Sequence, residues 1–489
     1  MRTLIIRVTT MTLELTRFSI LGLHGKYDIN IPIHDNRLIL VGVNGLGKTT
    51  VISFLYFVLS DQWLRLLDYD FVAIEISMNG DEIVITKADV ESKANSFDRY
   101  QKLMGRYAAR SPISRNILSR IFVHPSFAQI HATSGASRDK IIVSLARDLE
   151  MSPAYLRRMM DDVPASLQAD LFESLADPES LIRLGSLIKE AGEHQVIYLP
   201  TYRRIEQDLK AIFPNADSDD LKKLTSSVEN TVRTRSRGYV ELVQFGMQDV
   251  ERKLADELET IQKRMREQLS TLTASYLQDI IRSRADKINP ELIPLMSDGV
   301  VEKVLSRVEE NTLSANDKLE VQNAIRRIRT GANPPEARDQ YLTYFFSRLL
   351  EIYTDLYSSE EAIRNLVKTC NKYFVGKKLA YNDANFTSTV VDRDGDSLDW
   401  RVLSSGEKQV ASLFTHLHLT KGTSQIVLID EPELSLSVRW QKTLLPDISN
   451  SDNCKLLVAV THSPFIYTNE LDKYAVDLSK LIKSHSSYL

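Results

Sequence analysis

A glycine-rich segment at residues 42–49 has the spacing of a phosphate-binding loop. It reads Gly-Val-Asn-Gly-Leu-Gly-Lys-Thr, follows the apolar run 38–41 and precedes a helical pattern at 51–59. Glycines let successive backbone N–H groups surround a phosphate, and the N-terminus of the following helix adds partial positive charge. We predict that Lys48 reaches the β- and γ-phosphates of a nucleotide and that the Thr49 hydroxyl binds Mg²⁺. The residues predicted to contact this nucleotide are Gly42, Asn44, Gly45, Gly47, Lys48, Thr49 and Thr50.

Two acidic residues follow a second apolar run. Residues 426–429 are all apolar, which predicts a strand buried on both faces, and Asp430 and Glu431 stand at its carboxyl end. Carboxylates in such a place need a cation or water beside them. We predict that Asp430 holds Mg²⁺ through water and that Glu431 is the base that polarises an attacking water. Together with Lys48, the pair indicates hydrolysis of a nucleoside triphosphate.

Two further segments have the residue types of anion-binding sites. His462 directly follows the apolar run 456–460, although a single histidine at a strand end is usually structural. Ser404, Ser405, Gly406 and Glu407 precede a helix expected at 410–419. Small residues at a helix N-terminus present hydroxyl and N–H donors to an anion. The same four residues also fit a helix cap with Glu at the third position, so both interpretations stay open.

The order of these four segments resembles the ABC-type ATPase heads of the RecF, SMC and OLD-nuclease group. The segment at 403–407, Leu-Ser-Ser-Gly-Glu, resembles the LSGGQ signature, and the resemblance covers residues 1–90, 195–205 and 376–470. It implies an α/β head, with a mixed sheet and flanking helices built from N- and C-terminal halves, that binds ATP and Mg²⁺. It also implies that His462 contacts the γ-phosphate. Ser404 would serve the ATP of the opposite subunit, so that two ATP molecules join a homodimer of heads.

Residues 428–436, followed by Trp440 and Gln441, look like the OLD-like AAA-type ATPases of bacterial antiphage operons. Those proteins often carry His where this chain has Ser437, which leaves the role of that position open. The few residues after His462 do not suffice for a TOPRIM nuclease domain. The resemblance therefore implies a separate effector nuclease, as in PARIS systems (TOPRIM, favoured) or in Septu and retron-associated systems (HNH). The expected function is an ATP-hydrolysing scaffold and sensor, in a larger even-numbered oligomer, that releases this nuclease upon a phage-encoded trigger. The alternative is a RecF- or SMC-like DNA-binding repair ATPase.

These segments require a head that is interrupted by helices. We expect head portions at 1–205 and 376–489 and a helical insertion at 206–375. The helix predicted at 247–281 has apolar residues spaced by three or four, and a second long helix is predicted at 336–373. This pattern favours a packed bundle, with a protruding antiparallel coiled-coil arm or oligomerisation surface as the alternative. The apolar positions of the first helix are Met247, Val250, Leu254, Leu258, Ile261, Met265, Leu269, Leu272 and Tyr276.

Composition narrows the class of protein. The 489 residues are 43% hydrophobic and 26% charged, with 61 basic against 65 acidic residues, a net charge of −4. That balance excludes a globally basic coat for nucleic acid. Two cysteines and no long apolar run predict a cytoplasmic protein without a membrane span. Local basic clusters fit solvated helix ends and ion pairs better than a DNA surface; they are Arg203, Arg204, Arg233, Arg235, Arg237, Arg326, Arg327 and Arg329. Weak candidates for a lid-loop glutamine are Gln129 and Gln207.

Overall fold

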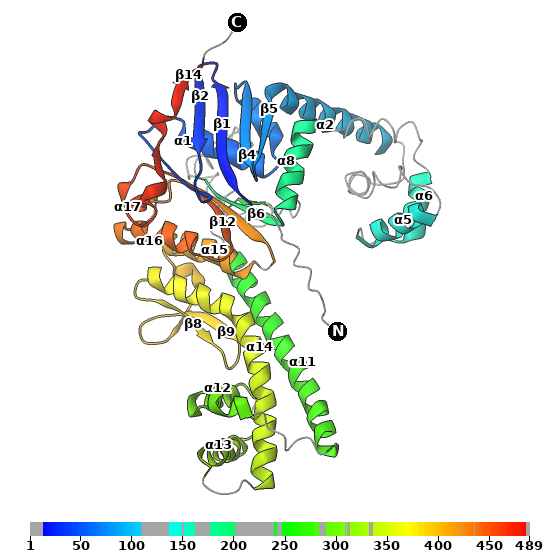
Figure 1. Ribbon diagram of the computed structural model, residues 1–489, viewed down its shortest axis with the longest axis vertical. Helices are drawn as coiled ribbons and strands as arrows, with labels where there is room; N and C mark the ends of the chain where they lie inside the picture. The colour runs from blue at the N-terminus through cyan, green and yellow to red at the C-terminus, as the bar shows by residue number, and fades with distance from the viewer. Residues whose placement is uncertain are drawn as a thin grey trace.

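The structure is a computed structural model (Figure 1). It describes residues 13–108, 136–148, 151–161, 177–200, 239–241, 247–282, 290–308, 310, 313–331, 336–420, 422–434 and 436–485. The candidate lid-loop residues and five of the predicted basic residues lie outside these ranges; they are Gln129, Gln207, Arg203, Arg204, Arg233, Arg235 and Arg237.

A six-stranded sheet forms the centre of the head, in the order β13-β3-β12-β11-β6-β7. Every neighbouring pair in it is parallel. The strands are β3 (Arg37–Val41), β6 (His194–Leu199), β7 (Tyr239–Glu241), β11 (Ser424–Asp430), β12 (Cys454–Thr461) and β13 (Ala475–Asp477). Residues 426–429 are fully buried, as expected of a central parallel strand that is covered on both faces.

A second sheet is antiparallel, in the order β14-β2-β1-β4-β5. Its strands are β1 (Leu15–Leu23), β2 (Tyr27–Pro32), β4 (Ala73–Met78), β5 (Asp81–Thr86) and β14 (Ile482–Ser484). The single mixed sheet predicted from the sequence is therefore wrong: parallel and antiparallel strands occupy separate sheets. The physical reason is helix α1 (Lys48–Leu59), which is buried along almost its whole length in the core that both sheets share. Its Tyr56 ring stacks on Tyr198 of β6, with ring centroids 4.4 Å apart.

Besides the short α17 (Pro464–Tyr467), four longer helices contribute to the core on the opposite face of the parallel sheet. They are α11 (Met247–Ile281), α14 (Ala337–Tyr373), α15 (Ser405–Leu419) and α16 (Val438–Ser449). Alternate residues of each strand divide between the two faces. Leu428 of β11 belongs to the core around α1, whereas Val427 and Ile429 belong to the core with these helices.

Helices α11 and α14 run antiparallel and extend away from the sheets (Figure 1). Arg264 of α11 pairs with Asp355 of α14 at 2.8 Å, and further out the Tyr344 hydroxyl donates to Asp279 at 2.9 Å. The outer part has its own apolar core, formed with η3 (Pro290–Leu295), α12 (Asp298–Ser306) and α13 (Ala315–Thr330). Arg326 and Arg329 pair with Asp298, and Arg327 pairs with Asp339. These three arginines form the ion pairs that the sequence favoured over a DNA surface.

The predicted insertion, residues 206–375, does not have a core separate from that of the head along its whole length. Strand β7 pairs with β6 inside the parallel sheet, although its residues fall within the predicted range 206–375. Leu254 of α11 and Leu366 of α14 share the core that includes Val427 of β11. The helices emerge from the head instead of beginning beyond it, because their inner halves cover one face of the sheet.

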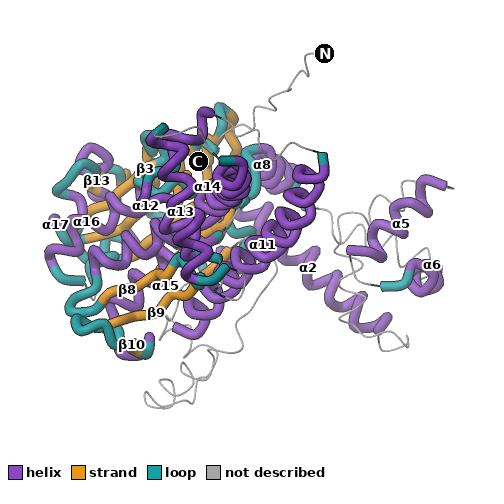
Figure 2. The backbone as a smooth tube through the Cα atoms, turned by 90° about the horizontal axis from the view of Figure 1, so that it is seen from below, coloured by secondary structure: helices purple, strands orange, loops and turns teal. Residues whose placement is uncertain are grey.

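The remaining elements lie around these layers. A small sheet contains β8 (Lys378–Asn382), β9 (Thr387–Val391) and β10 (Ser397–Leu398), and η4 (Trp400–Val402) follows it. Helices α5 (Ala136–Asp148) and α6 (Pro153–Asp161) lie beyond the end of α2 (Lys87–Ala108), away from the sheets, in both Figure 1 and Figure 2. Other elements are η1 (Trp63–Asp68), α8 (Glu179–Glu190), α17 (Pro464–Tyr467), η5 (Asp472–Tyr474) and η6 (Leu478–Lys480). Within the described ranges, no helix is long and apolar enough to span a bilayer.

Candidate nucleotide site

The loop between β3 and α1 has the shape of a phosphate cradle; we call residues 42–49 the P-loop. Gly45 and Gly47 have φ of 88° and 85°, a left-handed conformation that residues with a Cβ rarely adopt. Gly47 is the residue before α1, so the free N–H groups of the helix begin at the loop. The Lys48 side chain is buried, and its Nζ donates to the carbonyl oxygens of Gly42 at 2.9 Å and Val43 at 3.2 Å. A buried ammonium thus lies within the loop where phosphate is expected.

Strand order brings the separate sequence motifs together. Strand β12 lies between β3 and β11, and the parallel register aligns Val41 with Thr461 and Val460 with Asp430. All three strands therefore end at the same edge of the sheet. Across this edge the Thr49 hydroxyl donates to Asp430 Oδ1 at 3.3 Å. Lys48 Nζ lies 4.0 Å from Glu431 Oε1. The structure thus brings together side chains from two segments that the sequence selected independently.

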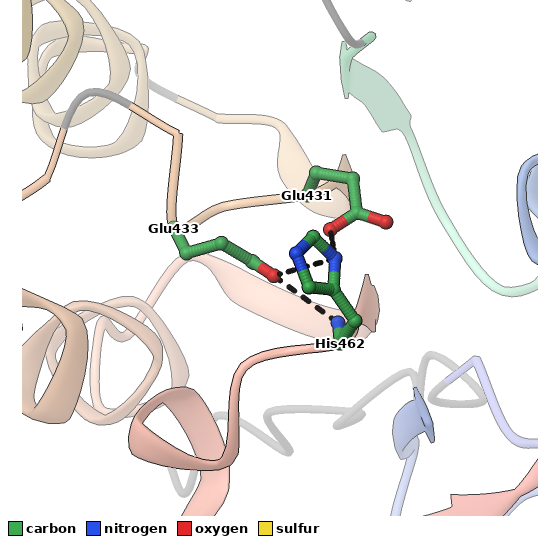
Figure 3. Close-up of side chains that lie close together, drawn as sticks. All are labelled: Glu431, Glu433 and His462. Carbon is green, nitrogen blue, oxygen red and sulfur yellow. Dashed lines mark hydrogen bonds and ion pairs between the residues drawn. The ribbon is translucent and has the colours of Figure 1, made fainter. Parts of the chain in front are cut away.

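The histidine after β12 contacts the predicted base. His462 Nδ1 lies 2.5 Å from Glu431 Oε2 and 3.2 Å from Glu433 Oε1 (Figure 3). Glu431 adopts φ 54°, which is unusual for a residue with a side chain. Its backbone N–H still donates to the Val460 carbonyl at 2.8 Å. The backbone conformation thus changes immediately after β11 while the chain stays attached to β12.

Glu433 is a site residue to which the sequence analysis gave no role. Both carboxylate oxygens accept from the Thr461 hydroxyl at 2.8 Å, and Oε1 also accepts from the backbone N–H groups of His462 and Ser463, each at 3.1 Å. The Glu433 side chain is only 7% exposed. It therefore fixes the turn that carries His462 while also contacting the imidazole. The signal in the sequence was a third acid, which directly follows Asp430, Glu431 and Pro432.

Electrostatics at this edge favour a protonated Glu431 before nucleotide arrives. Burial, followed by the hydrogen bond and the negative charge of Glu433, raises the pKa of Glu431 to about 8, against the lowering effect of Lys48. A carboxyl whose pKa is raised in this way is largely protonated at neutral pH, and positive charge brought close to it lowers its pKa and favours the basic form.

The donors and acceptors of this edge fit a nucleotide and Mg²⁺. Lys48 and the N–H groups at the start of α1 would hold phosphate oxygens. Thr49 and Asp430 already lie within hydrogen-bond distance, which suits two oxygen ligands for one small cation. The P-loop residues Asn44 and Gly45 are exposed, so the cradle is open to solvent.

The segment at 403–407, which we call the signature turn, starts a helix earlier than predicted. Helix α15 begins at Ser405 instead of Val410, with Ser404 as its N-cap. The Ser404 hydroxyl accepts from the Glu407 N–H, and Glu407 Oε2 accepts from the Ser404 N–H at 2.7 Å, which is a capping box. Ser404 and Ser405 are exposed, whereas Gly406 and Glu407 are buried. The Glu407 side chain is therefore buried, and the predicted contact of Glu407 with nucleotide stays a prediction.

The signature turn and the P-loop lie next to different cores of the chain. Helix α1, which follows the P-loop, belongs to the core that both sheets share, whereas α15 belongs to the core on the other face of the parallel sheet. The exposed hydroxyl groups of Ser404 and Ser405 are left facing solvent at a helix N-terminus.

A parallel sheet with a P-loop, a paired acid and a polar residue after the neighbouring strand defines an AAA-type ATPase domain. The chain belongs to the family whose model is described as "AAA domain, putative AbiEii toxin, Type IV TA system", which matches residues 222–468. No curated protein matches the sequence.

Two similar solved structures are Smc head domains from archaea. One, from Pyrococcus furiosus, has an extended coiled coil and is bound to the C-terminal domain of ScpA. Its sequence is 12% identical to this chain, and the match covers 94% of this chain and 92% of the Smc chain, with a TM-score of 0.32. The other, from Pyrococcus yayanosii, has a coiled coil and joint, is 13% identical with 94% coverage of both chains, and has a TM-score of 0.30. Scores this low support no inference about this chain.

Proposed function

We propose that this protein hydrolyses ATP to ADP and phosphate at sites completed by a second copy of the chain. The observation that carries the proposal is the meeting of Lys48, Thr49, Asp430, Glu431 and His462 at one sheet edge. The exposed signature turn begins a helix that packs on the other face of the parallel sheet from α1. A head-to-head pair of chains brings the Ser404 hydroxyl of each to the nucleotide of the other.

Each of these residues has a separate role in the proposed hydrolysis. Mg²⁺ held by Thr49 and Asp430 would neutralise phosphate charge. Lys48 and the P-loop N–H groups stabilise the negative charge that develops on the phosphate oxygens. Glu431 takes a proton from water as the water oxygen bonds to the γ-phosphorus, and the bond from that phosphorus to the β–γ bridging oxygen breaks. His462, beside Glu431, contacts the γ-phosphate and orients the Glu431 carboxylate.

Exposed apolar side chains close to the site in the chain support a paired head. Val43 of the P-loop is 72% exposed, and Leu434, Val438 and Phe465 are 43–48% exposed in the segments that follow the acid pair and His462. Apolar side chains gathered around a polar site are typical of protein interfaces. A second copy that covers them would also exclude water from the nucleotide.

Substitution of the base tests this activity. Glu431→Gln is expected to bind ATP, to lose turnover and to accumulate a stable ATP-bound dimer, measured by phosphate release and by mass determination in solution. Lys48→Ala is expected to lose nucleotide binding, which serves as the matched control. Undiminished phosphate release by Glu431→Gln contradicts the proposal.

We further propose that the ATPase is a regulatory scaffold for a separately encoded effector nuclease in antiphage defence, within a larger even-numbered oligomer. The OLD-like residues 428–436 support this, and so does the family description, which names a putative toxin of a toxin–antitoxin system. The test is co-expression with the protein encoded beside it, followed by affinity purification with ATP and mass determination. A nuclease that copurifies only with ATP supports the scaffold. A dimer that instead binds duplex DNA, with affinity that falls steeply with salt, favours a repair ATPase.

A further inference from the structure

The Glu407 carboxylate receives donors from outside its own helix. Oε1 accepts from the backbone N–H of Val375 at 3.0 Å, and Oε2 accepts from the Lys377 ammonium at 2.8 Å. Oε2 also accepts from the Ser404 N–H, so one side chain holds both the signature turn and the segment after α14. Glu407 is 2% exposed. Burial alone would raise its pKa, but these donors lower it, and the carboxylate stays charged.

The segment that reaches Glu407 is the direct continuation of the long helix α14. Val375 and Lys377 stand two and four residues after the last helical residue, Tyr373. The Tyr373 ring is buried against Phe414 of α15, and its hydroxyl donates to Asp447 of α16 at 2.7 Å. The end of α14 is thus fixed between the signature helix α15 and the helix that follows the acid pair.

A buried charge network joins α12, α14 and the β8–β9 hairpin. Arg307, just after α12, donates to both carboxylate oxygens of Glu360 on α14, at 2.6 and 3.0 Å. Both side chains are almost completely buried, 1% and 0% exposed. Arg364 bridges Glu360 to Asp383, which follows β8. Helix α12, helix α14 and the β8–β9 hairpin are therefore held together by paired charges that are costly to separate.

We propose that Glu407 is a positioning residue through which the helical insertion sets the geometry of the signature turn. The carboxylate receives α14 on one side and the Ser404 N–H on the other. A displacement of α14 therefore withdraws Val375 and Lys377, and the carboxylate is then held only by the capping box within its own turn. Ser404, the residue offered to the ATP of the opposite subunit, then loses its fixed orientation. This inference rests on the proposed trans-acting role of the signature turn.

The test compares neighbouring lysines. Lys377→Ala removes one donor to Glu407, Lys377→Arg keeps a charged donor, and Lys378→Ala changes an exposed lysine next to it. We expect Lys377→Ala to lower kcat for ATP about tenfold while the affinity of its own P-loop for a fluorescent ATP analogue stays unchanged. Lys377→Arg is expected to recover most of kcat, and Lys378→Ala to match the wild type. Equal kcat in Lys377→Ala and Lys378→Ala overturns the inference.

Two further measurements separate this inference from the proposed ATPase activity. Hydrogen exchange at residues 404–408 should quicken in Lys377→Ala but not in Lys378→Ala, and this readout needs no turnover. The kcat losses in Lys377→Ala and Glu407→Gln should be strongly non-additive, because both act on one contact. Unchanged exchange or fully additive losses contradict the coupling. A wild-type protein that does not hydrolyse ATP contradicts only the proposed activity.

Discussion

At the scale of single residues, the site depends on Glu433, a carboxylate that does not itself contact the reacting atoms. Glu433 accepts two backbone N–H groups and one hydroxyl from the turn after β12, and its Oε1 lies 3.2 Å from His462 Nδ1. Its charge also contributes to the raised pKa of Glu431. The placement of His462 and the protonation of Glu431 are therefore linked through one carboxylate.

Glu433→Gln should lower kcat at least about tenfold with little change in ATP affinity, because the amide leaves fewer acceptors for the turn that carries His462. Loss of the negative charge lowers the pKa of Glu431, so the base is ionised at lower pH. The acid side of the kcat–pH profile should therefore move to lower pH. Glu470→Gln, an exposed change in the following segment, is the control. A wild-type kcat together with an unmoved profile speaks against the role.

At the scale of elements, the signature helix is fixed to α11 by polar groups in an otherwise apolar interface. Lys253 of α11 donates to Thr420 Oγ1 at 2.7 Å and lies 3.4 Å from His416 Nδ1. Burial, followed by the Lys253 charge, lowers the pKa of His416 to about 3. Burial lowers the pKa of His418 to about 4. Both imidazoles are therefore neutral in the folded protein at neutral pH.

Acid should destabilise the protein through these histidines. In the unfolded chain they titrate near their ordinary value, so below about pH 6.5 the unfolded state binds more protons than the folded state. Between about pH 6.5 and the pKa that each histidine has in the folded protein, each should lower the free energy of unfolding by about 1.4 kcal/mol for every unit by which the pH falls. Urea unfolding at several pH values measures this slope. His416→Gln should flatten it, whereas exposed His24→Gln should not; equal slopes in both variants would refute the assignment.

The charge network at the base of the insertion gives a second prediction at this scale. Glu360→Ala leaves the Arg307 guanidinium buried without its main acceptor and should cost about 3–5 kcal/mol of unfolding free energy. Asp383→Ala removes a partly exposed member of the same network and should cost clearly less. Replacing Arg307 by Met and Glu360 by Leu together should restore much of the loss. Thermal or urea unfolding compares the three, and an equal cost for the two single changes would contradict the burial argument.

At the scale of the whole molecule, different layers of the fold hold the P-loop and the signature turn. Helix α1 lies in the core that both sheets share, which fixes the P-loop, while α14 and α15 fix the signature turn on the other face of the parallel sheet. The P-loop and the signature turn are therefore built on opposite sides of one sheet. In the proposed function, a second copy of the chain brings them together.

Phe465→Asp should therefore prevent pairing without affecting the P-loop. In a Glu431→Gln background, ATP should no longer produce a dimer, as measured by mass in solution, while binding of a fluorescent ATP analogue persists. The charge would be buried against an apolar surface in the pair, which disfavours association. Val84→Asp changes a similarly exposed apolar residue on β5, away from the site, and should leave pairing intact. Dimers of undiminished stability in Phe465→Asp would place the interface elsewhere.

Local pattern alone was enough to identify most elements and nearly all candidate site residues. The P-loop glycines, the acid pair after residues 426–429 and both long helices follow from conformational freedom and apolar spacing, which depend on neighbours in the chain. Helix α11 has the predicted bounds, Met247–Ile281. Asn79 and Gly80 turn the β4–β5 hairpin, with φ of 54° and 86°, a left-handed conformation that Asn and Gly adopt more readily than other residues.

Tertiary structure decided which of these local features meet. The position of β12 between β3 and β11 brings His462 to Glu431, and no spacing along the chain specifies strand order. Glu433 and Glu407 acquired their roles from donors 28 to 32 residues away. The separation of parallel from antiparallel strands likewise follows from the burial of α1 between them. Short-range propensity acts within an element, whereas the partners of a buried carboxylate are set by how elements pack, which requires the folded chain.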